Sequence, residues 1–157
     1  MASKKYPLEK LLELRERQKD EAAGELADAV TKRAAAELAF ARATQARLDA
    51  EAKARALRER ESEALAKGGL SVADLQRAGA WEHRVEAEQK GLATQEDQAR
   101  AGAESALGDE ADARGVLAQK QADAKVVEND RARHRAQAAR EAEAKAEEEA
   151  SEAWRKR

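Results

Sequence analysis

The 157-residue sequence contains no cysteine and a single proline, and aromatic residues make up only 3% of it. The lack of cysteine excludes disulfides, thiolate zinc sites and thiol chemistry, and it fits a reducing compartment. Isoleucine is also absent, so the large aliphatic residues are fourteen leucines and six valines. So few large apolar side chains cannot fill a globular core, but they can fill the narrow seam between two long helices.

No charge of one sign dominates, because the net charge is −2 although 39% of the residues are charged. This balance argues against a nucleic-acid-binding protein, which normally carries a clear basic excess. The sequence has no run of eighteen apolar residues, and residues 1–5 contain no apolar signal-peptide segment. We therefore expect a soluble cytoplasmic protein without direct membrane insertion.

The residues that usually carry chemistry are scarce or isolated. The only histidines are His83 and His134, and both are expected to be exposed helix residues. Gly68 and Gly69 lack the lysine spacing and the preceding strand of a phosphate-binding loop. Because two packed helices offer no enclosed pocket for an acid and a base, the sequence predicts no catalytic residue, no cofactor and no metal site.

The one strong turn signal is Lys-Gly-Gly-Leu-Ser at residues 67–71. Two adjacent glycines can end a helix, and Ser71 lies three residues before Asp74, the spacing of a capping box. Leu70 and Leu75 flank this cap as a hydrophobic staple would. We therefore predict an all-α fold, a long two-helix antiparallel coiled-coil hairpin over residues 1–157, with a helix at 7–67, a turn at 67–71 and a helix at 72–157.

The predicted first helix carries larger apolar residues that are often eighteen positions apart, which is five turns of an α-helix. This spacing predicts a nearly straight stripe with gentle supercoiling, made of Leu8, Leu12, Leu26, Val30, Phe40, Leu48, Leu57 and Leu65. At its N-terminal end, four leucines cover an arc of roughly 160° at 100° per residue, wider than one partner helix needs. These are Leu8, Leu11, Leu12 and Leu14. They either dock a partner or clamp a fraying helix end.

The predicted second helix has a heptad column that consists of Ala78, Val85, Leu92, Ala99, Ala106, Ala113 and Val127, with Leu75, Trp81, Ala103 and Leu117 near the companion column. A tight turn brings together residues whose numbers add up to about 138. Leu57 then faces Trp81, Leu12 faces Val126 and Val127, and Phe40 faces small residues near Ala99. Trp81 is expected to pack in the seam, although an exposed contact role is also open.

Five glycines interrupt the second helix, and they are Gly79, Gly91, Gly102, Gly108 and Gly115. Each costs about 1 kcal/mol relative to alanine, so this helix should be soft. We favour close helix approach combined with a tolerant exposed surface, and a rod that must bend is the alternative.

The two helices are unequal in length, so residues 131–157 should project beyond the partner helix. This overhang is highly charged and includes Arg133, Lys156 and Arg157, and it ends near Trp154. Without an apolar stripe it should be ordered mainly when bound. Trp154 has no predicted seam partner, so it either contacts another protein or is disordered.

The opening Lys5-Tyr6-Pro7-Leu8-Glu9-Lys10-Leu11-Leu12-Glu13-Leu14-Arg15, and the segment Leu70-Ser71-Val72-Ala73-Asp74-Leu75 followed by Trp81, resemble the type III secretion stalk family. That family includes YscO-type injectisome proteins and flagellar FliJ. The resemblance implies a stalk with paired termini in the pore of a hexameric export ATPase, and a tip near the cytoplasmic ring of the export gate. It also implies contact with secretion chaperones and a cytoplasmic location at the membrane-embedded apparatus.

The resemblance assigns two sets of contact residues. The predicted ATPase-end contacts are Leu8, Leu11, Leu12, Leu14, Arg15, Arg133 and Trp154, and the predicted gate contacts at the tip are Leu57, Leu70, Leu75 and Trp81. The alternatives are a passive alanine-rich spacer and a homodimeric coiled-coil scaffold. A hairpin that satisfies its own seam should instead be a monomer when free.

Overall fold

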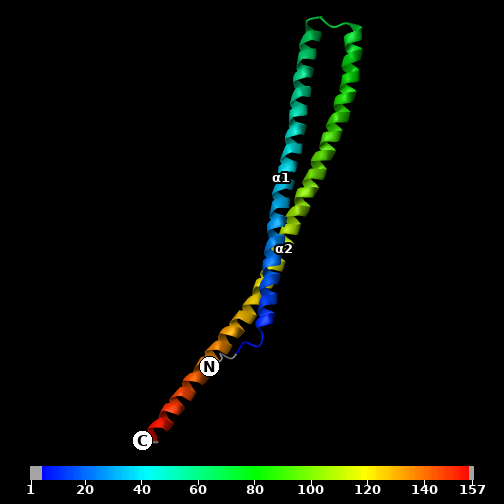
Figure 1. Cartoon of the computed structure of the whole chain (residues 1–157). Helices are drawn as coiled ribbons and strands as arrows, with labels where there is room; N and C mark the ends of the chain where they lie inside the picture. The colour runs from blue at the N-terminus through cyan, green and yellow to red at the C-terminus, as the bar shows by residue number, and fades with distance from the viewer. Residues whose placement is uncertain (1–4, 156–157) are drawn as a thin grey trace. The chain divides into compact units, whose positions relative to one another are not determined.

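A computed structural model describes residues 5–155 of the chain as two long α-helices that pack against each other as a hairpin (Figure 1). Helix α1 is Glu9–Ala66 and helix α2 is Val72–Arg155. α1 begins two residues after the predicted start and ends one residue before the predicted end. Lys156 and Arg157, which belong to the predicted overhang, lie outside the described residues.

The turn between the helices is built as its sequence predicts. Gly68 has a φ of 70°, a left-handed conformation that favours glycine, and its N–H bonds to the carbonyl of Leu65 at 3.0 Å. The N–H of Gly69 bonds to the carbonyl of Ala64 at 3.1 Å, which completes a Schellman-type helix end. The backbone N–H of Ser71 donates to Asp74 Oδ2 at 2.9 Å, and the N–H of Asp74 donates to Ser71 Oγ at 3.2 Å. The predicted capping box is confirmed.

The helices divide into two compact units. Unit 1 combines the residues up to Asp28 with those from Ala111 onward, and unit 2 spans Ala29–Glu110. In unit 1, Arg15 pairs with Asp123, and these residue numbers add up to 138. In unit 2, Arg58 pairs with Glu82, which add up to 140, and Arg33 pairs with Glu110, which add up to 143. The antiparallel register is therefore within about five positions of the predicted one in each unit.

The predicted apolar stripe of α1 is wrong in detail. Its members Leu8, Val30, Leu48, Leu57 and Leu65 are all exposed by 40% or more. Most shielded positions of α1 instead recur every seven residues, in two columns. One consists of Leu12, Lys19, Leu26, Arg33, Phe40, Arg47, Ala54 and Glu61. The other consists of Arg15, Ala22, Ala29, Ala36, Ala43, Ala50 and Ala64, and is interrupted at the exposed Leu57. A seven-residue repeat is the period of a left-handed coiled coil, not of the straight stripe that we predicted.

The predicted heptad column of α2 is confirmed. Every member from Ala78 to Val127 is buried or half-buried. The five glycines of α2 behave differently from our favoured prediction, because a Cβ added at any of them meets nothing within 4 Å. They are exposed, as predicted, but close helix approach does not explain them.

Charged pairs occupy much of the seam of unit 2. Glu110 is only 1% exposed and lies 3.1 Å from Arg33 Nε. Glu96 accepts hydrogen bonds from Thr44 at 2.9 Å and from Arg47 Nε. A buried carboxylate is costly unless it is paired, so these contacts fix which residues of α1 and α2 can face each other.

The C-terminal part of the chain is the end of α2 and not a separate helix. The predicted boundary of the overhang at residue 131 is wrong, because Arg131 pairs with Glu9 at 2.8 Å and His134 contacts Tyr6. From residue 139 to residue 155 every residue is exposed. Over the described residues, no helix is long and apolar enough to cross a membrane.

Candidate functional site

The N-terminal part of unit 1 is held by an aromatic anchor that sequence analysis missed. Tyr6 is buried with Leu12 and Val127, and Leu11 packs against this cluster. The Tyr6 hydroxyl donates to Asp130 Oδ2 at 2.7 Å. Burial and this hydrogen bond raise the pKa of Tyr6 to about 12.

His134 packs against the same anchor. Its ring lies 5.5 Å from the Tyr6 ring at an interplanar angle of 65°, an edge-to-face arrangement. The prediction that His134 is an exposed helix residue is therefore wrong, whereas His83 is exposed as predicted. The anchor joins the segment before α1 to the side of α2, and a lone tyrosine in an irregular segment gave no periodic signal for it.

The predicted ATPase-end residues form two groups that differ in their exposure to solvent. Leu12 is 3% exposed and faces Val127 as predicted, and Leu11 and Arg15 are half-buried beside it. The Arg15 guanidinium is also engaged, because its Nη1 lies 3.1 Å from Gln18 Oε1 and 3.5 Å from Asp123 Oδ2. These three residues hold the helices of unit 1 together, so little of their surface is left for a partner.

The remaining residues of the predicted ATPase end are open to solvent. Leu8 and Leu14 are 43% and 48% exposed, Arg133 is exposed, and Trp154 is 85% exposed. Leu8, Leu14, Arg133 and Trp154 all belong to unit 1. Tryptophan and arginine are enriched among the residues that dominate protein interfaces, and an exposed leucine gains apolar burial when a partner covers it.

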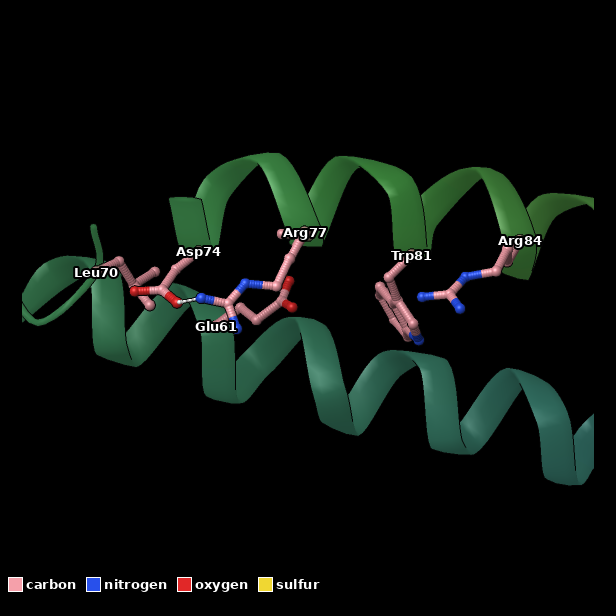
Figure 2. A pocket seen from close by; sticks show the side chains of 7 residues that line it. Glu61, Leu70, Asp74, Arg77, Trp81 and Arg84 are labelled. Carbon is pink, nitrogen blue, oxygen red and sulfur yellow. Dashed lines mark hydrogen bonds and ion pairs between the residues drawn. The ribbon is translucent and has the colours of Figure 1, made fainter. Parts of the chain in front are cut away.

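A hollow of about 370 Å³ lies beside the turn in unit 2. We call it the turn hollow, and its lining consists of Glu61, Leu70, Asp74, Arg77, Ala78, Trp81 and Arg84. Figure 2 shows Arg77 and Trp81 reaching from α2 toward α1, with the ion pair between Arg77 and Asp74 drawn as a dashed line. Two of the predicted tip contacts, Leu70 and Trp81, therefore share one surface.

The other two predicted tip contacts do not line the turn hollow. Leu57 and Leu75 are both exposed. Trp81 is half-buried. The aromatic and apolar groups of the hollow stand beside two guanidinium groups, Arg77 and Arg84, which sequence analysis did not single out.

The wall of the turn hollow is fixed by the helix cap. Asp74 accepts hydrogen bonds from both the N–H and the hydroxyl of Ser71, which lower the pKa of its carboxyl group. Arg77 Nη2 lies 3.1 Å from the other carboxylate oxygen of Asp74. The capped first turn of α2 therefore places the Asp74 carboxylate beside Arg77, whose side chain is largely exposed.

The described residues contain no group of three or more histidine, aspartate or glutamate side chains placed to hold a metal ion. Comparisons with protein-family models, curated proteins and solved structures found no match to this chain. The functional assignment therefore depends on the arrangement of the residues themselves.

Proposed function

We propose that this chain is the central stalk of a type III protein export apparatus, which links a hexameric export ATPase to the cytoplasmic ring of the export gate and escorts secretion chaperones. Large apolar residues are exposed along both helices, and the observation that carries the proposal is that each unit has some of them at a predicted contact region. Leu8, Leu14 and Trp154 lie in unit 1, and the turn hollow with Leu57 and Leu75 lies in unit 2. A stalk needs two separate contact regions.

The end of α2 is the second support for the proposed ATPase contact. Residues 139–155 are helical and exposed on all sides, and they carry Trp154 near their end. We propose that this segment forms the overhang that enters the ATPase pore, where Trp154 contacts the ring, and that Arg133, which precedes the segment, also contacts the ring. A helix without an apolar stripe gains order from a partner and not from its own packing.

The resemblance of the opening residues and of the first turn of α2 to the stalk family is the third support. A passive spacer needs neither the exposed leucines of unit 1 nor the aromatic hollow of unit 2. A homodimeric scaffold would bury its apolar residues between two copies, and we propose instead that the seam is filled within one chain, as in the cluster of Tyr6, Leu12 and Val127. We therefore propose a free monomer that works in the cytoplasm at the base of the apparatus.

The test of the proposed ATPase contact is a binding measurement with purified export ATPase. Replacing Leu8 and Leu14 by serine should weaken binding at least tenfold, because both side chains are exposed and free to contact a partner. Leu38→Ser is the matched control, since Leu38 is an equally exposed leucine of α1 but lies in unit 2. Equal binding by the wild type and the Leu8, Leu14 variant, with helicity unchanged, would refute the assignment.

The gate contact is tested with the isolated cytoplasmic domain of the export gate. Trp81→Ala and Arg84→Glu should weaken this binding and leave ATPase binding intact. Arg42→Glu, a charge reversal at another exposed arginine of unit 2, is the control for a general change of charge. Loss of both partners with any one of these variants would contradict two separate contact regions.

A further inference from the structure

In nearly all the ion pairs across the seam, α1 supplies the positive charge and α2 supplies the negative charge. We call this arrangement the direction of the pairs. In unit 2, arginines of α1 pair with glutamates of α2, in the pairs Arg58–Glu82, Arg47–Glu96 and Arg33–Glu110. In unit 1, Arg15 of α1 pairs with Asp123 of α2. Glu9–Arg131, beside the N-terminal anchor, has the opposite direction.

This direction makes the two helices specific for each other. If these same positions met between two α1 helices, arginines would lie against arginines, and between two α2 helices carboxylates would lie against carboxylates. Like charges in contact are destabilising, so these positions favour the pairing of α1 with α2 over the pairing of two α1 helices. Nothing in these contacts, however, requires that α2 belongs to the same chain.

The turn is the element that decides which chain supplies α2. It reverses the backbone through Gly68, whose φ of 70° is the only positive φ among the described residues. An L-residue at this position disfavours the left-handed conformation and favours continuation of the helix. If residues 67–71 became helical, α1 would lead straight into α2, and the two helices of one chain could no longer meet.

We propose that the Gly68–Gly69 turn selects a monomer, and that a chain whose turn is straightened exchanges α2 with a second copy. The resulting antiparallel dimer contains the same arginine–carboxylate pairs as the hairpin, each now formed between chains. The partner that fits the seam is therefore a second copy of this chain, and the two glycines prevent it from binding.

The first test is the mass of the Gly68→Ala, Gly69→Ala variant measured by light scattering. The wild type should have a mass of 17.1 kDa. The variant should have twice that mass with unchanged helicity. Gly79→Ala, Gly91→Ala is the matched control, because it makes the same two changes inside α2 and should remain a monomer. A monomeric or unfolded turn variant, or an equally dimeric control, would overturn the proposal.

The second test exploits the direction of the pairs. Arg47→Glu and Glu96→Arg are made separately in the alanine-turn background, with a different affinity tag on each chain. In each variant alone, positions 47 and 96 carry like charges, and they face each other in a hairpin and in a homodimer alike. In a mixed dimer with exchanged helices, position 47 of each chain faces position 96 of the other chain. Both of these contacts are then between opposite charges. We expect mixing to give heterodimers in at least tenfold excess over homodimers, and a statistical mixture would overturn the exchange.

Discussion

For the five glycines of α2, the structure determines the sign and the size of the stability change that alanine should cause. Gly79, Gly91, Gly102, Gly108 and Gly115 lie inside a helix, and a Cβ added at each meets nothing within 4 Å. Alanine at each position should therefore remove the conformational cost of glycine without creating a clash, for a gain of about 1 kcal/mol per site.

The combined effect should be large. Neighbouring glycines are six to twelve residues apart, or roughly 9–18 Å along the helix, so their effects should add. The variant with all five replacements should be stabilised by about 5 kcal/mol and should melt about 10–20 °C above the wild type. Far-UV circular dichroism measures both quantities, in a urea titration and in a thermal scan.

Matched controls separate the backbone effect from a general benefit of alanine. Ala101 and Ala118 are exposed positions of α2, and replacing either by glycine should cost about 1 kcal/mol. A stability gain below about 1 kcal/mol for the fivefold variant would refute the argument from open space. If the stabilised variant also loses partner binding, the glycines serve a helix that must bend.

Further predictions concern charge, packing and the N-terminal anchor. Hydrogen bonds from Arg58 and Arg47 lower the pKa values of Glu82 and Glu96 below the ordinary 4.5, so these pairs stabilise the fold above that pH. Their contribution should disappear as the pH falls through the folded-state pKa values. In urea titrations below about pH 4.5, the unfolding free energy of the Glu82→Gln, Glu96→Gln variant should therefore depend less on pH than that of the wild type. Leu12→Ala should lower the unfolding free energy by about 2–5 kcal/mol because Leu12 is buried. Leu14→Ala should change it by less than about 0.5 kcal/mol because Leu14 is exposed. Equal losses for the two variants in urea titrations would contradict the assigned faces. Tyr6→Phe should lower the melting temperature because it removes the hydroxyl that bonds to Asp130, and Tyr6→Ala should lower it further, since the ring contact with His134 is also lost.

Local sequence signals predicted the elements that depend on local geometry. The positive φ of Gly68 and the box between Ser71 and Asp74 involve residues within a few positions of each other, so their spacing was sufficient. The heptad column of α2 was also visible, because Val85, Leu92 and Val127 mark it among alanines.

The seam of α1 could not be predicted from its large apolar residues. One of its columns consists mostly of alanines, and the other contains charged residues such as Arg33 and Arg47. Arginine in a shielded column is stable here because a carboxylate of α2 faces it, and that pairing is visible only once both helices are aligned. Val30 and Leu48 lie outside the columns and therefore remain exposed.

The candidate site was predicted in part for a similar reason. Exposure separates Leu8 and Leu14 from the buried Leu12, although the four leucines near the start of α1 look equivalent in sequence. Arg77 and Arg84 become notable only because they line the same hollow as Trp81. Tyr6 was missed because its partners Val127 and Asp130 are more than 120 residues away.

The most direct test of the proposed stalk is a bridging measurement with all three proteins. Immobilised export ATPase is incubated with the cytoplasmic domain of the export gate, with and without this chain, and the retained gate domain is quantified. The account predicts retention only when the chain is present, with retention lost in Trp81→Ala although that variant still binds the ATPase. A gate domain that is never retained, or that is retained equally without the chain, would contradict it.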